Sequence, residues 1–422
     1  MTPELKGFIL LSVVKMVLVF TVIMVGVALL TLMERKVSAW MQNRRGPNRV
    51  GWAGLLQPAA DGVKNILKEE TYPGLASPWL FVLAPALSFI PALLLSGVIP
   101  FAAPLPVDFD FTARFSFLGL FPIDFGRWVH HGLMPMVVAD LPIGFLFVLA
   151  ISSMGVYGIA LAGWSSNSKY ALLGGLRASA QMISYEVAMG LSLIPVLLMS
   201  GNVSFTAIIR DQQAGLWYVL PLFLSFFIFL ISGFAETNRL PFDLPEAESE
   251  LIAGYHTEYS AMKFSFFFIA EYANVVTVCA MVTTLFFGGW DIPGHWDEQG
   301  GVLQTLATGG FFFLKVMFWI FFVMWIRWTL PRFRYDQLMA LGWKVLMPLA
   351  LAYIMVICTA IYGIEHVAGI TDPKLRSLAL FGVNVVLGLL IFGLLDSGVF
   401  IKGSNRRQQT SKALAKRATV TG

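Results

Sequence analysis

The stretch ETNRLPFDLPEAESELIAGYHTEYSAM, Glu236–Met262, lies between two long apolar runs. It carries six carboxylates and one arginine in a chain that is otherwise strongly apolar; these residues are Glu236, Asp243, Glu246, Glu248, Glu250, Glu258 and Arg239. Carboxylates between two membrane-length helices must meet water, cations or moving protons, because hydrocarbon does not solvate a charge. The alternative is a solvated connecting loop, since runs of charged residues usually face water.

The apolar runs on both sides of this stretch predict a polytopic membrane protein. Of the 422 residues, 57% are hydrophobic and 13% are charged, which is outside the range of soluble domains. Nine runs are long enough to cross a hydrocarbon core of about 30 Å as helices. They cover residues 8–33, 79–101, 133–164, 176–199, 216–235, 264–287, 310–330, 345–364 and 378–401. We therefore expect an all-α transmembrane domain over residues 1–401, with amphipathic helices in the cytoplasmic loops, followed by a basic cytoplasmic tail over residues 402–422.

The distribution of Lys and Arg predicts the orientation of this domain. With the segment after the first run placed in the cytoplasm, twenty-one Lys and Arg lie on the cytoplasmic side and six on the other side. Cytoplasmic loops carry the excess of positive charge in membrane proteins. The N-terminus is therefore expected outside and the C-terminal tail inside, in a bacterial cytoplasmic (inner) membrane. This distribution also accounts for the net charge of +4, so the charge gives no indication of nucleic acid binding.

The segment after the first run, residues 34–70, contains a basic turn and a short amphipathic pattern. Arg44, Arg45 and Arg49 surround the turn Gly46-Pro47-Asn48, and residues 55–67 place Asp61 and Lys64 on one polar side. This pattern fits an interfacial helix under anionic headgroups, or equally the rim of a cavity that a partly apolar ligand enters from the bilayer. The opposite loop, residues 102–132, is rich in Pro, Phe and Asp, and we expect it to be irregular.

Three acidic residues fall inside or near the ends of the predicted spans. Glu186 lies near the middle of the fourth span, Glu271 lies in the sixth, and Asp140 lies close to Pro142 in the third. An ionised carboxylate at mid-membrane costs about 2.5–3.5 kcal/mol on insertion scales, so it persists where it meets a partner or a wet cavity. For Glu186 and Asp140, a structural hydrogen bond to a neighbouring helix is the alternative to a role in proton transfer.

The sequence offers no sign of a redox centre or nucleotide site on this chain. The two cysteines, Cys279 and Cys358, lie in separate spans and cannot supply the ligands of an iron–sulfur or zinc site. The five histidines show no ligand spacing, and neither a phosphate-binding Gly loop nor a dinucleotide fingerprint is present. Two function classes fit the remaining pattern: a stand-alone ion-coupled transporter and a membrane subunit of a redox-driven pump. The absence of a clear internal repeat favours the second class.

Two long strings resemble the H subunit of respiratory complex I, the proton-pumping NADH–quinone oxidoreductase. The strings are ERKVSAWMQNRRGPNRVGWAGLLQPAADGVKNILKEE and AETNRLPFDLPEAESELIAGYHTEYSAMKFSFFFIAEY, and SAQMISYEVAMG between them is similar to the same family. The similarity runs from about the first span to the eighth. The ninth span, the basic tail and the long outer loop depart from the family pattern.

The resemblance implies roles for individual residues. Those near the mouth of a quinone cavity would be Arg35, Lys36, Arg44, Arg45, Asp61, Lys64, Arg239 and Asp243. Those that couple quinone reduction to proton translocation would be Glu236, Glu246, Glu248, Glu250, Glu258, Glu186, Asp140 and Glu271. A catalytic residue and a metal site are not expected on this chain.

The resemblance also implies the partners of the chain. Quinone would be the substrate, while flavin and iron–sulfur clusters would reside on partner subunits. Those partners would be peripheral iron–sulfur quinone-reducing subunits, small membrane subunits and antiporter-like membrane subunits, all assembled in the lipid bilayer. The nearest alternative within the resemblance is the related membrane subunit of an energy-converting nickel–iron hydrogenase or formate hydrogenlyase.

Overall fold

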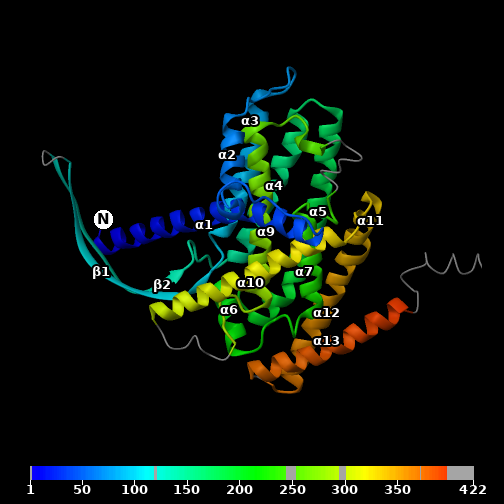
Figure 1. Cartoon of the computed structure of the whole chain (residues 1–422). Helices are drawn as coiled ribbons and strands as arrows, with labels where there is room; N and C mark the ends of the chain where they lie inside the picture. Colours follow the sequence, from blue (N-terminus) through cyan, green and yellow to red (C-terminus); the bar gives the residue numbers. More distant parts are fainter. Residues whose placement is uncertain (1, 118–120, 244–252, 294–300, 371, 397–422) are drawn as a thin grey trace, which may run out of the picture.

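The computed structural model describes residues 2–117, 121–243, 253–293, 301–370 and 372–396 (Figure 1). Its helices and strands, in chain order, have the following bounds. They are α1 Pro3–Met41, η1 Trp52–Gly54, α2 Gln57–Leu67, α3 Pro78–Ser96, β1 Ala102–Phe117, β2 Phe121–Met136, α4 Gly144–Ser165, α5 Lys169–Ser200, α6 Phe205–Ala214, α7 Phe223–Glu236, η2 Gly254–His256, α9 Ala261–Phe286, α10 Val302–Thr329, α11 Tyr335–Ala340, η3 Leu341–Leu346, α12 Met347–Tyr362, η4 Gly363–Val367 and α13 Pro373–Asp396.

The predicted all-α membrane architecture is confirmed. Within the described ranges, eight helical segments are long and apolar enough to cross a membrane: α1, α3, α4, α5, α9, α10, the continuous segment Tyr335–Val367, and α13. Helix α7 is also apolar, but with 14 residues it is shorter than these eight segments. Helices dominate because every backbone N–H and C=O inside hydrocarbon must find a partner, and an α-helix supplies these partners within one segment.

Helices α3, α4, α5 and α9 stand side by side, and α1 and α10 cross them at a steep angle (Figure 1). Small residues allow the closest approach in this bundle. A Cβ on Gly163 of α4 would lie 2.6 Å from the carbonyl oxygen of Ala171 and 3.2 Å from the Cα of Gly175, both on α5. Glycines at such crossings let two backbones pack directly, which is the usual way helices associate in lipid.

The outer loop, residues 102–132, was expected to be irregular, and this prediction is wrong. Its described residues form a long antiparallel hairpin of β1 and β2. Their pairing runs from Ala102 opposite Met136 to Phe117 opposite Phe121, with irregularities between Ala102 and Leu105 and between Ala113 and Arg114. The hairpin arches away beside the N-terminal part of α1 (Figure 1). Lys15 of α1 donates to the backbone carbonyls of Pro135 and Val137, at 3.2 and 2.8 Å, and so ties the hairpin to the bundle.

Two helices begin later than the apolar runs suggested, and in both cases a proline lies just before the first helical residue. The third run was expected to be helical from residue 133, but residues 133–136 pair within β2 and α4 begins at Gly144, after Pro142. The fifth was expected from residue 216, but α7 begins at Phe223, after Pro221. A proline cannot donate a helical hydrogen bond, so apolar residues ahead of it need not be helical.

Candidate functional site

A group of five side chains forms a buried charge cluster where α1, α9 and α10 meet the turn after α7. We call it the central cluster; its members are Glu34, Arg239, Glu271, Tyr272 and Arg327. It contains two carboxylates and two guanidinium groups, so the formal charges balance. Charged groups can remain buried when they are paired in this way, because the attraction between partners offsets the free-energy cost of removing each charge from water.

Arg239 holds the two carboxylates of the central cluster together. Its Nη1 lies 2.9 Å from Oε2 of Glu34, and its Nε lies 2.7 Å from Oε1 of Glu271. The Arg239 side chain is 3% exposed. Burial lowers the pKa of Arg239, but the carboxylates of Glu271 and Glu34 outweigh this effect and raise the pKa above its usual value. Arg239 therefore stays charged and binds the two acids from opposite helices.

Glu34 is the acceptor on which most of the cluster converges. The hydroxyl of Tyr272 donates to Oε2 of Glu34 over 2.6 Å, and Arg327 donates to Oε1. The guanidinium of Arg239 also lies over the Tyr272 ring, 3.9 Å from its centroid. Each carboxylate oxygen of Glu34 thus has a charged donor, which is the strong type of hydrogen bond.

Asp243, four residues after Arg239, forms a second ion pair with Arg332. Asp243 accepts from Nη2 of Arg332 over 2.9 Å, while its Oδ1 is buried with no hydrogen-bond partner among the described residues. Burial raises the pKa of Asp243, and the Arg332, Arg327 and Arg239 charges oppose this only in part. Arg332 thus supplies the counter-charge of this buried acid.

A second group of acids lies between α4, α5 and the end of α7. Ser153 of α4 donates to Glu186 of α5, and Glu236, the last residue of α7, interacts with Ser152 and Glu186. The Oε2 atom of Glu236 is buried and has no hydrogen-bond partner in the described part of the chain. Glu236 and Arg239 are three residues apart, so one short turn connects this pair of acids to the central cluster.

Gln181 of α5 fixes the path of that turn. Its amide nitrogen donates to the carbonyls of Ala235 and Phe242, each over 2.8 Å, and the residue is fully buried. The ring of Phe242 packs against Tyr185 at 5.6 Å between centroids. By joining Ala235, near the end of α7, to Phe242, this buried amide sets the path of the turn that carries Arg239. Arg239 and Asp243 of this stretch are thus buried inside the protein and do not lie in a solvated loop.

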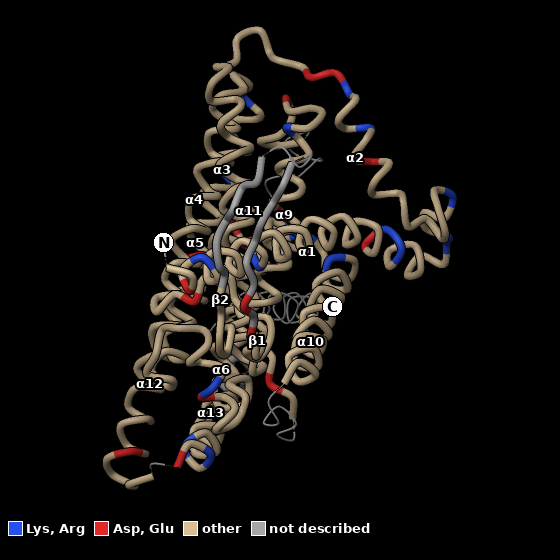
Figure 2. The backbone as a smooth tube through the Cα atoms, turned by 90° about the vertical axis from the view of Figure 1, so that its left-hand side faces the viewer, with Lys and Arg blue, Asp and Glu red and all other residues tan. Residues whose placement is uncertain are grey.

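The basic residues expected at the cavity mouth lie in the exposed segment that follows Glu34, apart from the central cluster. Arg35 pairs with Asp61 of α2 at 2.6 Å, and Lys36 donates to the carbonyl of Ala53. Arg44, Arg45 and Lys64 are exposed. Charged residues gather along α2 and the loops beside it, whereas the bundle shows few (Figure 2). The structure does not bring these side chains into the central cluster.

The other predicted site residues are not members of the central cluster. Asp140 is exposed and accepts from the hydroxyls of Ser204 and Thr206 at 3.5 and 3.1 Å. Glu258 is half-buried near η2. Glu246, Glu248 and Glu250 lie outside the described residues.

Sequence reasoning missed three members of the central cluster: Glu34, Tyr272 and Arg327. Glu34 stands in the charged string ERK and was assigned to the cytoplasmic loop. A helical projection could have found it, because residues 30 and 37 are apolar and lie on the same face of a helix as residue 34. Tyr272 and Arg327 carry no comparable local signal.

The amino-acid sequence matches one family model and several named relatives. A sequence model of the family described as NADH dehydrogenase matches residues 14–358. The chain is 51% identical to an NADH-quinone oxidoreductase H subunit of Koribacter versatilis over 83% of this chain and 96% of that protein. It is 49% identical to an H subunit of the same enzyme from Geobacter metallireducens over 83% and 95%, and 48% identical to the one from Leptospira biflexa over 81% and 92%.

Proposed function

The chain belongs to the NADH dehydrogenase family, as a membrane-embedded H subunit of NADH-quinone oxidoreductase, and from this premise we propose that its buried charges couple quinone reduction to proton translocation. The relatives are named as subunits of an enzyme, so this chain acts as part of an enzyme complex. Quinone is the substrate that this identity implies. Flavin and iron–sulfur clusters would be carried by partner subunits.

The observation that carries the proposal is the balance of the central cluster. Glu34 and Glu271 are neutralised by Arg239 and Arg327, and all four lie within the membrane bundle or at its edge. Reduction of a quinone to a quinol takes up two protons and changes the charge nearby. In a site of low dielectric, such a change alters the proton occupancy of neighbouring carboxylates as a coupled set.

The turn after α7 provides the route by which this change spreads. Asp243 and Arg239 sit on the turn itself, and Glu236 ends the helix that leads into it. Movement of Arg239 between its two acids would displace Glu236, whose carboxyl interacts with Glu186 and whose Oε2 has no hydrogen-bond partner among the described residues. The proposal extends this route towards Asp140 at the other end of the bundle, and includes Glu246, Glu248, Glu250 and Glu258 on the side where quinone enters.

The exposed segment between α1 and α3 would form the rim of the quinone cavity. Its helix α2 has no buried residue, and both flanks are tethered to the bundle. Arg35 binds Asp61 on one flank, and Lys263 binds Glu70 over 2.9 Å on the other. In this proposal the rim faces the cytoplasm of a bacterial inner membrane, next to the peripheral iron–sulfur subunits. The antiporter-like subunits would receive the signal within the membrane.

Glu34→Gln tests the proposal most directly. The change keeps the shape of the side chain but leaves Arg239 and Arg327 without their shared anion. We expect at least a tenfold loss of inhibitor-sensitive NADH–quinone reductase activity in membrane vesicles, and an equal loss of proton pumping. NADH–ferricyanide activity, which reports assembly of the flavin-bearing partner, should be retained.

The matched control is Glu4→Gln, the same change at the exposed start of the same helix. It should leave all three activities unaltered. Wild-type quinone reduction and pumping in Glu34→Gln would refute a coupling role for the central cluster. Co-purification of hydrogenase activity with the tagged chain in place of NADH–quinone reductase activity would refute the assigned reaction.

A further inference from the structure

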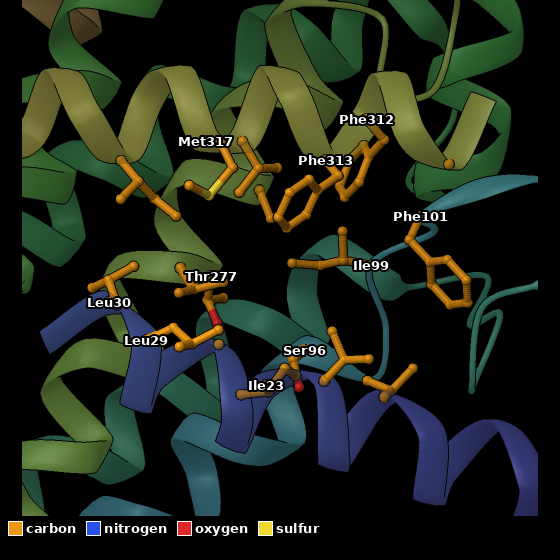
Figure 3. A pocket seen from close by; sticks show the side chains of 18 of the residues that line it. Ile23, Leu29, Leu30, Ser96, Ile99, Phe101, Thr277, Phe312, Phe313 and Met317 are labelled. Carbon is orange, nitrogen blue, oxygen red and sulfur yellow. The ribbon is translucent and has the colours of Figure 1, made fainter. Parts of the chain in front are cut away.

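The turn after α7 is held by donors from distant parts of the chain. The backbone N–H of Phe333 donates to the carbonyl of Pro241 over 3.2 Å, and the side chain of Gln181 donates to the carbonyl of Phe242. By contrast, the apolar cavity between α1 and α10 has no charged residue in its lining (Figure 3). That cavity therefore offers no ionic group to the reaction, whereas the turn carries Arg239 and Asp243.

The amide of Gln181 closes the turn. Its Nε2 donates to the carbonyls of Ala235 and Phe242, each over 2.8 Å, and to Oδ1 of Asn238 over 3.3 Å. Ala235 and Phe242 are seven positions apart, a length of chain that would span about 23 Å if it were extended. One nitrogen therefore holds together the two ends of the segment that carries Arg239.

Gln212, a second buried glutamine, shows how such a side chain supports the fold when both of its ends are paired. Its Nε2 donates to the carbonyl of Thr284 over 3.0 Å, and its Oε1 accepts from the backbone N–H groups of Tyr218 and Gly288 over 3.2 and 3.0 Å. In Gln181 the Oε1 atom is instead buried with no hydrogen-bond partner among the described residues. Because an unpaired buried acceptor destabilises a fold, what the nitrogen of Gln181 holds explains this residue better than stability alone.

A small displacement of the turn would break the contacts of Arg239. Its Nη1 lies 2.9 Å from Glu34 on α1, and its Nε lies 2.7 Å from Glu271 on α9. Hydrogen bonds of this kind have lengths up to about 3.2 Å, so a shift of roughly 1 Å would disrupt both. The hydrogen bonds of Gln181 reach the backbone and Asn238 rather than Arg239, so its effect on Arg239 passes through the backbone of the turn.

We propose that Gln181 is a positioning residue of the enzyme, which sustains turnover by fixing the turn that places Arg239 between Glu34 and Glu271. It acts through Arg239 and itself carries neither charge nor proton. The inference rests on the proposed coupling role of the central cluster, and it adds to that role a neutral residue on α5.

Gln181→Met tests this role in the whole complex, in membrane vesicles. Methionine has a similar length but no donor, so it fills the space and releases both carbonyls. With a short-tailed quinone as acceptor, we expect the kcat of NADH–quinone reduction to fall at least fivefold and the KM for quinone to stay unaltered. The kcat is expressed per assembled complex, measured by NADH–ferricyanide activity. A purely structural role would lower the amount of complex and leave this kcat unchanged.

Gln212→Met is the matched control, because it removes hydrogen bonds from both ends of a buried glutamine near the start of α7. It should lower the heat stability of the complex at least as much as Gln181→Met, yet leave kcat and KM at their wild-type values. An equal loss of kcat in the two variants would overturn the proposal. Gln181→Asn, which keeps the amide but is one methylene shorter, is the second variant and should also lower kcat. If neither variant at position 181 assembles, Gln181 serves the fold and the proposal falls.

Arg239→Lys shows whether the effect passes through Arg239. Lysine keeps the positive charge but lacks the planar group that reaches both acids. In this background Gln181→Met should lower kcat less than twofold further, since residues that act together give non-additive effects. A larger further loss, or a wild-type kcat in Gln181→Met alone, would overturn the proposal.

Glu34→Gln, measured in parallel, separates this inference from the function on which it rests. Impaired turnover in Glu34→Gln together with normal turnover in Gln181→Met would reject the role of Gln181 alone. Normal turnover in Glu34→Gln would reject the coupling role of the central cluster itself.

Discussion

Arg239 lies where the two buried carboxylates of the central cluster meet. One guanidinium group binds Glu34 through Nη1 and Glu271 through Nε, and its face covers the ring of Tyr272. Only an arginine offers donors in two directions on a planar group that can also stack on an aromatic ring. At the scale of the residue, this one side chain connects α1, α9 and the turn after α7.

Arg239→Ala should destabilise the protein, because it leaves two buried carboxylates short of a counter-charge. Removing one partner of a buried ion pair costs about 3–5 kcal/mol. The measurement is the fraction of tagged chain that remains in the intact complex on native gels after graded heating. Adding Glu271→Gln to Arg239→Ala should recover part of the loss. An unaltered heating profile in Arg239→Ala would show that the ion pairs contribute little.

His256 predicts a dependence of stability on pH. Burial lowers its pKa to about 4, below the usual value of about 6.5. Between these two values the unfolded chain binds a proton that the folded chain does not, so stability is full above about pH 6.5 and falls as the pH drops towards 4. The slope for one such group is about 1.4 kcal/mol per pH unit.

His256→Gln removes this titration and should flatten the decline of the thermal inactivation midpoint between pH 6.5 and 5. His366→Gln, at an exposed histidine, should follow the wild-type profile. If the His256 variant and the wild type decline in parallel, another group causes the acid sensitivity.

At the scale of the element, α13 is fastened to the bundle by two polar side chains. Asn384 accepts from the hydroxyl of Tyr353 over 2.8 Å and donates to the carbonyl of Pro221. Arg376 pairs with Glu365 at 3.1 Å and also reaches Asp211 at 3.8 Å. The family match ends at residue 358, before this helix begins. These contacts nevertheless make α13 part of the same packed body.

Asn384→Leu should loosen α13, because it removes the hydrogen bonds of a buried side chain to the Tyr353 hydroxyl and to the Pro221 carbonyl. Each such loss costs about 1–3 kcal/mol. The readout is the rate at which protease cuts the 363–373 connection in detergent-solubilised complex, which should rise several-fold. Val385→Leu, on the neighbouring exposed position, is the control. Equal cleavage rates in the two variants would mean that α13 is held by apolar packing alone.

At the scale of the whole molecule, charged residues gather around α2 at one end and around α13 at the other (Figure 2). Two ion pairs hold the exposed segment around α2 to the bundle, and Lys263 also lies 3.4 Å from the centroid of the Tyr72 ring. Through its hydrogen bond to Glu70, Lys263 lowers the pKa of that carboxyl. The segment is thus held against the bundle while it stays exposed, which suits the proposed rim of the quinone cavity.

Single-cysteine labelling should reveal the orientation of the molecule. In a background that lacks Cys279 and Cys358, Thr2→Cys should react with an impermeant maleimide in spheroplasts. Asn48→Cys should react only in inverted vesicles. The reason is the excess of Lys and Arg on the side of residue 48. The reverse pattern of labelling would place the basic segment outside and contradict the predicted topology.

The sequence alone determined the membrane architecture and pointed to the acidic stretch after α7. Hydropathy is a sum over neighbouring residues, and the long apolar runs therefore reveal the helices that the structure contains. The hairpin β1–β2 was missed because its strands depend on pairing with each other, and Pro- and Asp-rich strands give a weak local signal.

Only the tertiary structure decided which charges meet. Glu34 and Arg239 are 205 positions apart, and Glu34 and Arg327 are 293 apart, yet each pair is in direct contact. Gln181 then sets the turn that delivers Arg239 to this point. The physical reason is that a buried charge is stable only beside its partner, and the packing of distant helices, which no local pattern encodes, determines what that partner is.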